Sequence, residues 1–319
     1  MTERLPKCVK SWLASSTAPG ASNPQCWLPT IRRTDGVRQT QPIPVSSQSI
    51  VIESGLAERH YWRDLWRFRE LFLVLAWRDV SVRYKQTVIG LAWVMLQPLA
   101  SAAVFTLIFG RVAKLPSLEG VPYALMVFAA LLPWQLMSTA MNNAANSLIG
   151  NAGLISKVYF PRLIVPGSAV VVCLVDFVVA LAVMAGLMLW FQYVPDARVL
   201  MLPVFLLMAL LVAIGPGLMI ASLNVRYRDF RQVLPFILQF GMYLSPVAYA
   251  SAVVPEQWKL LYHLNPAVAV IDGFRWCLLQ GATPIYWPGL MLSWAVIGLM
   301  LFAGVRQFRK TERTFADMV

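Results

Sequence analysis

The sequence predicts an all-α integral membrane protein with six transmembrane helices, and three observations lead to this prediction. Hydrophobic residues make up 58% of the 319-residue chain, charged residues only 13%, and the mean hydropathy is +0.62. A soluble domain carries about 25% charged residues, so much of this protein's surface must face lipid. Several charge-free runs also reach the length of about 20 apolar residues that a helix needs to cross a bilayer. Three further elements are expected: an N-terminal interfacial amphipathic helix, a short cytoplasmic helix and a re-entrant helix pair on the outer side.

Composition divides the chain into four regions. Residues 1–50 are rich in Pro, Ser, Thr and Gln and have no hydrophobic period, which indicates either a disordered tail or an over-extended gene start. They contain no apolar signal-peptide core, so the first span is expected to act as the targeting signal. Residues 51–88 form an amphipathic membrane-surface region, residues 89–305 the six-span domain and residues 306–319 a cytoplasmic C-terminal tail.

Residues 58–86 are predicted to form a helix that lies in the plane of the membrane surface. Apolar side chains recur at helical spacing, and the Arg residues between them are too numerous for a span. The alternative is an ordinary helix packed on a cytoplasmic domain. The residues expected at the membrane surface are Trp62, Arg63, Trp66, Arg67 and Arg78.

The six spans are expected at residues 89–109, 121–141, 163–190, 201–222, 233–253 and 287–305. With these bounds, 22 of the 27 Lys and Arg residues lie on one side of the membrane together with both termini. Positive charge gathers on the cytoplasmic side of membrane proteins, so both termini are expected in the cytoplasm. The net charge of +12 therefore reflects topology rather than binding to nucleic acid. Pro98, Pro133, Pro216 and Pro246 fall inside spans and are expected to kink them.

A helix that is too short to cross the membrane lies between the fifth and sixth spans. Asn265 is suited to cap its N-terminus, Pro266 to the first helical position and Gly281 to its C-terminal stop. The helix has about 15 residues and a length of roughly 22 Å. Asp272 and Arg275, at i,i+3 spacing, can pair on it. A re-entrant helix pair is favoured over a helix pair on the surface.

No catalytic residue and no metal site are predicted. The two histidines, His60 and His263, have no carboxylate cluster near them, and the four cysteines lack metal-ligand spacing. No phosphate-binding loop occurs, so this chain is expected to bind no cofactor and any ATP must be bound by another chain. Asp176 lies in the middle of the third span, where it is either a proton relay or substrate contact, or a polar contact between helices. The absence of further such groups favours the helix contact.

Aromatic residues and two basic loops are the remaining candidates for function. Aromatic rings inside spans suit a path for sugars, although core packing and interfacial belts explain most of them. The candidates for the channel lining are Phe105, Phe109, Trp134, Tyr243 and Tyr249. Residues 148–160 form a short amphipathic segment tipped by Lys157 and Arg162, and residues 223–235 contain a second basic loop. Either loop can anchor to anionic headgroups or act as a lever for a cytoplasmic motor.

From about residue 58 to the C-terminus, the chain resembles the membrane subunits of type-two ABC exporters for polysaccharides, the group that handles O-antigen, capsule and teichoic acid. Four blocks carry the resemblance in matching order: LAWRDVSVRYKQTVIGLAWVMLQPL (75–99), NAGLISKVYFPRLIVPGS (151–168), LNVRYRDFRQVLPFILQFGMYLSPVAY (223–249) and LNPAVAVIDGFRWCLLQG (264–281). The long N-terminal tail departs from the family pattern.

The resemblance implies a permease of the bacterial inner membrane that works as a homodimer with two copies of a separate ATP-binding subunit, which holds ATP-Mg. The implied substrate is an undecaprenyl-linked polysaccharide that moves from the cytoplasm to the periplasm. The resemblance also implies a coupling segment that docks on the ATPase, with Asn151, Leu154, Ser156, Lys157, Tyr159, Phe160 and Arg162. It implies a periplasmic gate with Tyr262, Asn265, Pro266, Asp272, Phe274 and Arg275.

Three other functions are weighed against this one. A lipid-linked glycosyl or phosphoglycosyl transferase would need paired acidic motifs at the membrane edge, which the sequence lacks. A secondary flippase driven by ion gradients would show more spans and internal repeats. An exporter of a drug or of another lipid remains the alternative within the exporter class.

Overall fold

The computed structural model describes residues 61–85, 90–114, 116–118, 120–155, 157–158, 160–227 and 229–312. Every regular element in these ranges is a helix, as the sequence predicted. The predicted tail over residues 1–50 lies outside the described residues, as do residues 313–319 of the predicted C-terminal tail. The helices are α2 (Tyr61–Arg67), α3 (Arg69–Lys85), α4 (Gly90–Phe105), η2 (Thr106–Val112), α5 (Tyr123–Gly150), α6 (Ala152–Ile155), α7 (Ile164–Trp190), η3 (Ala197–Met201), α8 (Leu202–Arg226), α9 (Phe230–Leu244), η4 (Ser251–Val253), α10 (Glu256–Tyr262), α11 (Pro266–Leu278) and α12 (Trp287–Glu312).

Five helices in the described part are long and apolar enough to cross a membrane, and they match five of the six predicted spans. They are Ala92–Val112, which joins α4 to η2, Tyr123–Gly150, Ile164–Trp190, Ala197–Arg226, which joins η3 to α8, and Trp287–Glu312. Helices α5 and α12 continue several residues beyond their predicted ends, because polar residues can extend a helix past the hydrocarbon region. The chain is therefore a multi-pass helical protein.

The fifth predicted span, residues 233–253, is only partly helical. Helix α9 has 15 residues, which corresponds to about 22 Å and is shorter than a bilayer core of about 30 Å. The helix ends at Leu244 because Ser245 precedes Pro246, whose ring forces the residue before it out of the helical region. Ser245 is accordingly extended, with φ −99° and ψ 153°. The predicted helical end at residue 253 is thus wrong.

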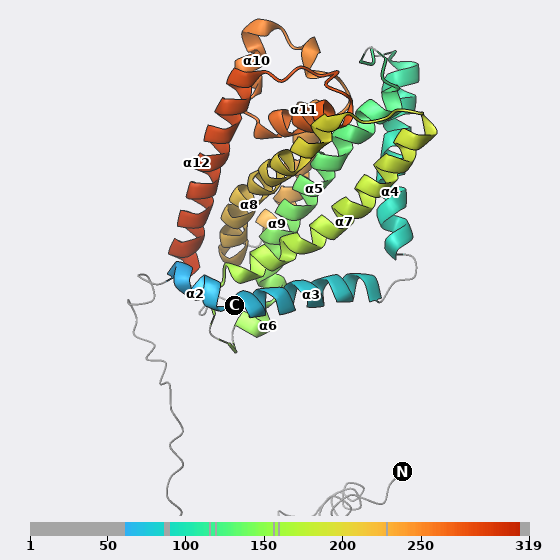
Figure 1. Ribbon diagram of the computed structural model, residues 1–319. Helices are drawn as coiled ribbons and strands as arrows, with labels where there is room; N and C mark the ends of the chain where they lie inside the picture. The colour runs from blue at the N-terminus through green and yellow to red at the C-terminus, as the bar shows by residue number, and fades with distance from the viewer. Residues whose placement is uncertain are drawn as a thin grey trace, which may run out of the picture. The chain divides into compact units, whose positions relative to one another are not determined.

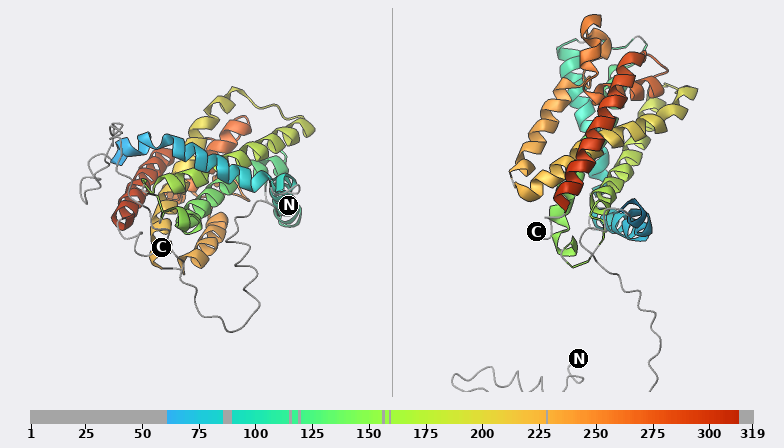
Figure 2. Two further views of the ribbon diagram at one scale, coloured as in Figure 1. Left: turned by 90° about the horizontal axis from the view of Figure 1, so that it is seen from below. Right: turned by 90° about the vertical axis from the view of Figure 1, so that its left-hand side faces the viewer.

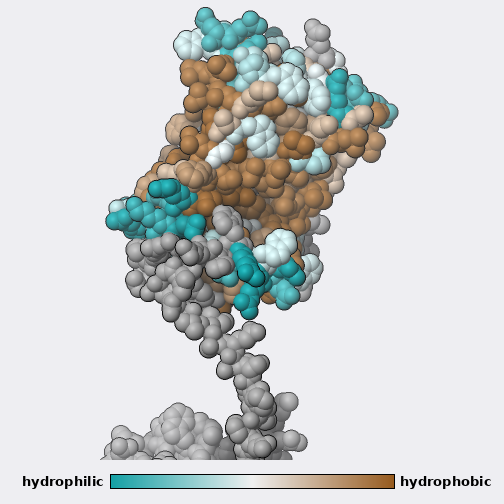
Figure 3. Space-filling model, turned by 60° about the vertical axis from the view of Figure 1, so that its left-hand side comes forward, coloured by the Kyte–Doolittle hydropathy of each residue, from teal (hydrophilic) through white to brown (hydrophobic). Residues whose placement is uncertain are grey.

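The spanning helices form a bundle whose two ends differ. Helices α5, α7, α8 and α12 run along one another, while α2 and α3 lie across the end at the bottom of Figure 1, beside α6. We call this the lower end, and the end that carries α10 and α11 the upper end. The view from below in Figure 2 shows α2 and α3 crossing the lower end of the bundle. On the face shown in Figure 3, hydrophobic side chains form a band between hydrophilic residues at the two ends.

Helix α5 is the central helix and α4 the most peripheral of the five. Over its most apolar 18 residues, 67% of α5 is buried inside the bundle. The corresponding share is 11% for the span formed by α4 and η2. Glycines bring the neighbouring backbones close to α8. A Cβ atom on Gly304 of α12 would lie 2.2 Å from the carbonyl oxygen of Gly215, and one on Gly217 would lie 3.0 Å from the Cβ of Ala144. Small residues at such crossings allow the close packing that holds membrane helices together.

The predicted helix over residues 58–86 is present as α2 and α3, with an interruption at Phe68. Leu75 is buried against the lower ends of the spanning helices, with Leu65 and Phe72 packed beside it. The apolar stripe that the sequence assigned to the membrane surface therefore packs on the bundle. Trp66, which the sequence places at the membrane surface, is exposed, as are Leu73, Val74 and Trp77 of α3.

Helix α11 at the upper end begins as predicted, but it ends earlier than the predicted stop at Gly281. The side-chain oxygen of Asn265 accepts a hydrogen bond of 3.1 Å from the Ala267 amide, and Pro266 occupies the first turn of α11. The helix ends at Leu278, and the left-handed conformation that follows is adopted first by Gln280, with φ +52°, and then by Gly281, with φ +75°. Helix α11 has 13 residues and is buried along almost its whole length, whereas α10 is exposed.

Candidate functional site

A groove of about 330 Å³ lies between α5 and α9. Polar side chains line it within an otherwise apolar bundle, together with the indole of Trp134. Gly241 allows this indole to approach α9, because a Cβ atom there would lie 3.0 Å from Trp134 Cη2. The lining residues are Trp134, Ser138, Thr139 and Asn142 of α5 and Pro235, Leu238, Gln239 and Met242 of α9. The groove thus offers hydroxyl and amide groups beside an aromatic ring.

The polar lining continues along α5 toward the lower end. Asn146 Nδ2 donates to the carbonyl oxygen of Asn142 at 2.9 Å and to its Oδ1 at 3.0 Å. Asn146 Oδ1 is buried and has no hydrogen-bond partner in the described residues. Ser138, Asn142 and Asn146 recur every fourth residue and so share one face of the helix. An amide without a partner in an apolar interior is costly, which makes this face a candidate for contact with water or substrate.

Sequence analysis did not select these polar residues. The signal that could have found them is the recurrence of Ser and Asn at i,i+4 spacing through an apolar span, together with Gln239 on a neighbouring helix. The signal is specific only once α5 and α9 are known to face each other. Other polar residues of the same helix have different partners: Asn143 Nδ2 donates to Cys173 Sγ at 3.2 Å.

Of the five aromatic residues predicted to line a channel, Trp134 alone lines this groove. Tyr243 is exposed on α9, with 58% of its surface accessible. Phe105 and Phe109 contact each other at the junction of α4 and η2, with ring centroids 5.5 Å apart. The Tyr249 hydroxyl lies near the upper end and hydrogen-bonds the Tyr262 hydroxyl at 2.8 Å.

The segment predicted to couple to an ATPase is less helical than expected. Residues 148–160 were predicted as one amphipathic segment, but α5 runs to Gly150 and α6 covers only Ala152–Ile155. Lys157 is exposed, Leu154 is partly buried and Phe160 is buried in the lower cluster. Side chains of this segment are therefore divided between the surface and the bundle. Ser156 and Tyr159 lie outside the described residues.

Arg162 is bound within the chain. Its backbone amide donates to Glu312 Oε1 at 2.9 Å, and its guanidinium donates to the Glu312 carbonyl oxygen. Arg309 lies 4.8 Å from the ring centroid of Tyr61. Burial, reinforced by the nearby Glu312 carboxylate, raises the pKa of the Tyr61 hydroxyl. The end of the coupling segment, the end of α12 and the start of α2 thus meet at one point.

Asn151 and Arg78 link the coupling segment to α3. Arg78 Nη2 donates to Asn151 Oδ1 at 2.6 Å and forms an ion pair of 2.7 Å with Asp79. Of the other residues predicted at the membrane surface, Arg63, Trp66 and Arg67 are exposed. The side chain of Trp62 lies outside the described residues.

Asp176 is engaged by the C-terminal end of α3. Arg83 Nη2 lies 2.8 Å from Asp176 Oδ2, and the Tyr84 hydroxyl donates to Asp176 Oδ1. These contacts join the interfacial region to α7. They support the second of the two sequence interpretations, a polar contact between helices.

Three of the six residues predicted at a periplasmic gate, Tyr262, Asn265 and Arg275, contact the segment that follows α9. Arg275 is completely buried and donates to the carbonyl oxygens of Tyr249, Val247 and Met126 at 2.9, 3.1 and 3.3 Å. The expected ion pair is not formed: within the described ranges, no salt bridge joins Asp272 to Arg275. The guanidinium instead satisfies two carbonyls of the loop after Pro246, those of Val247 and Tyr249, and binds one carbonyl of α5.

The remaining residues predicted at the gate have different surroundings. Asn265 Nδ2 donates to Ser245 Oγ at 3.0 Å, and Tyr262 contacts Tyr249 as described above. Phe274 packs edge-on against Phe177 with centroids 5.9 Å apart. Pro266 and Asp272 are buried.

Comparison with known proteins identifies the family. Residues 70–279 match the model of the ABC-2 type transporter family. The chain is similar to the O-antigen export system permease protein RfbA of Myxococcus xanthus, with 27% identity over 260 residues, 81% of this chain and 98% of that protein. It is also similar to the polysialic acid transport protein KpsM of Escherichia coli, with 22% identity over 242 residues, 74% of this chain and 91% of that protein.

A third relative is the capsule polysaccharide export inner-membrane protein CtrC of Neisseria meningitidis serogroup A. It is 27% identical over 210 residues, 63% of this chain and 76% of the relative. The family match extends from α3 through α11 and includes the groove, the coupling segment and the buried arginine. The chain therefore belongs to the ABC-2 type transporter family and is a multi-pass inner-membrane protein of that family.

Proposed function

We propose that this chain is the transmembrane subunit of an ATP-driven exporter that moves undecaprenyl-linked polysaccharide, of the O-antigen type, from the cytoplasm to the periplasm. The relatives' names, which describe O-antigen and capsule export, support the substrate class. The single structural observation that carries the proposal is the polar groove between α5 and α9.

The chemistry of the groove suits a sugar chain. Amide and hydroxyl groups such as those of Asn142 and Gln239 can exchange hydrogen bonds with sugar hydroxyls. The flat apolar face of a pyranose ring stacks on an indole, and Trp134 supplies one. A hydrophobic drug would leave these polar groups without partners, which disfavours a drug as the substrate.

The path is completed by a second copy of the chain. Helix α9 packs only Leu234 fully into the bundle and exposes Phe236, Phe240 and Tyr243. Helix α4 is similarly exposed. A symmetric homodimer that pairs these faces would enclose the two grooves along one axis.

The proposed topology has six crossings and both termini in the cytoplasm. The five long helices supply five crossings, and α9 with the turns over residues 245–249 supplies the sixth. The asymmetric distribution of Lys and Arg supports a cytoplasmic position for the lower end. Helices α2 and α3 then lie at the cytoplasmic membrane surface, and α10 and α11 form a re-entrant pair that gates the periplasmic end.

Two copies of a separate ATP-binding subunit, with ATP-Mg bound there, drive the cycle. This chain then binds no nucleotide and catalyses no reaction of its own. The exposed Lys157, beside the four-residue helix α6, is the residue best placed to touch the ATPase. The contacts of Arg162 with Glu312 would transmit the ATPase motion to α12.

The experiment that tests the proposal is deletion of the gene, followed by separate recovery of lipid-linked glycan from the cytoplasm and from the cell surface. Export predicts full-length polymer inside the cell and none at the surface. Complementation with the Asn142→Leu variant should restore less surface polymer than the wild-type gene. Absence of polymer from both fractions would mean a synthetic enzyme and would overturn the proposal.

A further inference from the structure

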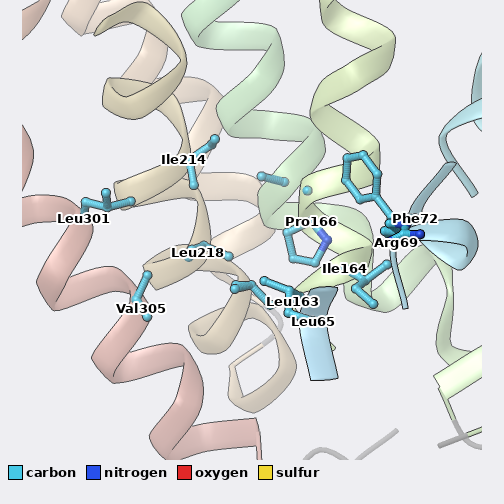
Figure 4. Close-up of a pocket in the computed structure, with 12 residues that line it drawn as sticks. Leu65, Arg69, Phe72, Leu163, Ile164, Pro166, Ile214, Leu218, Leu301 and Val305 are labelled. Carbon is cyan, nitrogen blue, oxygen red and sulfur yellow. The ribbon is translucent and has the colours of Figure 1, made fainter. Parts of the chain in front are cut away.

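An apolar cavity of about 360 Å³ lies at the lower end of the bundle, away from the groove. Six helices, α2, α3, α5, α7, α8 and α12, and Leu163 just before α7 contribute to its wall. Figure 4 shows Arg69 and Phe72 of α3 on one side, Leu301 and Val305 of α12 on the other, and Pro166 between them. The remaining lining residues are Leu65, Ala144, Leu163, Ile164, Gly167, Ile214 and Leu218.

Arg69 is the single charged residue among those that line the cavity. It is exposed, and its guanidinium carbon lies 5.9 Å from the ring centroid of Trp66. Arg63 and Arg67 are exposed on the same helical segment. The cavity therefore combines an apolar interior with one arginine in its wall, at the end of the bundle that α2 and α3 cross.

We infer that this cavity binds an acyl chain of an anionic phospholipid, with Arg69 at the phosphate of its headgroup. An apolar cavity of this size in a bilayer protein is filled most favourably by a hydrocarbon chain, because an empty one forfeits the contacts of its lining. Guanidinium groups bind phosphate through strong charge-assisted hydrogen bonds. Basic residues at the membrane surface also favour anionic over zwitterionic lipids.

The position of the cavity argues for a phospholipid rather than the lipid carrier of a glycan. Ala144 lines the cavity and Asn142 lines the groove. Because these residues are two positions apart on α5, their side chains differ in direction by about 200° around the helix axis. The two spaces therefore lie on opposite sides of the helix. A carrier with its tail in the cavity would hold its glycan away from the groove. The inference does not depend on the proposed function.

A bound acyl chain would contact the interfacial helices and the spanning helices at the same time. Within the cavity wall, Leu65 and Phe72 come from the interfacial helices, Ile214 and Leu218 from α8, and Val305 from α12. The lipid would fill the space between them and stabilise the lower end, where the coupling segment also lies. A lipid that binds only the folded state of the protein stabilises that state by mass action.

The test uses the purified full-length chain in a neutral detergent, with phosphatidylglycerol or phosphatidylcholine added in mixed micelles. Lipid binding is measured by native mass spectrometry, and stability by the thermal midpoint of unfolding. Phosphatidylglycerol should bind more tightly and raise the midpoint more. Arg69→Ala should weaken phosphatidylglycerol binding by about tenfold, the loss expected for one charged hydrogen bond.

The matched control is Arg67→Ala, which removes an exposed arginine of the adjacent turn that does not line the cavity. It should leave binding within about twofold of wild type, the range of a screened surface charge. A second pair tests the cavity itself: Val305→Phe fills it, whereas Leu299→Phe adds the same ring at an exposed position of α12. Only Val305→Phe should reduce the number of lipids retained.

Three results would each overturn the inference. One is equal binding of phosphatidylcholine and phosphatidylglycerol, and another is equal loss in the two arginine variants. The third is a co-purified lipid, released by Arg69→Ala, that is a polyprenyl phosphate. The arginine pair and the analysis of co-purified lipid remain decisive if Val305→Phe does not fold.

Discussion

The backbone amide of Arg162 and the carboxylate of Glu312 are joined by a hydrogen bond of 2.9 Å, although the residues are 150 positions apart in the chain. The same carboxylate lies close to Tyr61, so the end of the last span holds both the coupling segment and the start of α2. A displacement of the coupling segment would therefore pull on α12 directly.

Removal of the Glu312 carboxylate should weaken this connection. Glu312→Ala leaves the Arg162 amide without its acceptor and should lower export several-fold, whereas Glu312→Gln keeps an acceptor oxygen and should lower it less. Surface polymer is measured at matched protein levels in the membrane. Lys310→Ala, an exposed change in the same turn, is the control. Equal export in the alanine and glutamine variants would argue against the hydrogen bond.

Charge reversal at Lys157 and at Arg162 should have different consequences. Lys157 is exposed, so Lys157→Glu should leave the thermal midpoint of the chain unchanged and weaken its association with the ATPase. Arg162 contacts Glu312, so Arg162→Glu should place two carboxylates together and lower the midpoint itself. Co-purification of the ATPase and thermal unfolding separate the two effects. Normal ATPase binding and normal export by Lys157→Glu would remove this residue from the coupling interface.

Loss of one amide from the groove should reduce export without unfolding the protein. Asn142→Leu removes a hydrogen-bonding partner for substrate, which corresponds to about a three- to tenfold loss of transport. Asn143→Leu is the matched control, because Asn143 contacts Cys173 and does not line the groove. The rate of glycan appearance at the cell surface provides the measurement. Equal loss in both variants would mean a general effect on α5.

The contact of Arg83 with Asp176 should appear as an energetic coupling in a double-mutant cycle. The two side chains are 39% and 18% exposed, so screening limits the expected coupling to about 1 kcal/mol. Unfolding of Arg83→Ala, Asp176→Asn and the double variant in detergent gives this value. A substrate-contacting or proton-carrying Asp176 would instead show loss of export by Asp176→Asn with unchanged stability.

The approach of α12 to α8 depends on the absence of a side chain at Gly304. Gly304→Val would place atoms against the backbone of Gly215, and the helices must separate, which should cost about 1–3 kcal/mol of stability. Gly298→Val, on the same helix, meets no atom within 4 Å and should change stability little. The thermal midpoints of the two variants check this. Equal midpoints would contradict the close packing described for these helices.

Sequence patterns were sufficient for the elements that depend on neighbouring residues. Long apolar runs predict α5, α7, α8 and α12, because a segment in lipid must form its backbone hydrogen bonds within its own helix. The cap at Asn265 and the stop at Gly281 are local for the same reason. The early end of α9 also has a local cause, since Pro246 determines the conformation of Ser245. A prediction based on average hydropathy misses this end, because it does not consider the backbone preference of the residue before a proline.

Contacts between distant segments were decided only by the tertiary structure. Asn142 and Gln239 become one polar surface because α5 and α9 lie side by side. Arg275 was expected to pair with a residue three positions away but binds carbonyls of two other segments. A long, flexible side chain selects among all the partners that folding brings within its reach. The sequence thus determined which five segments are long and apolar enough to cross a membrane, and packing determined which polar groups meet between them.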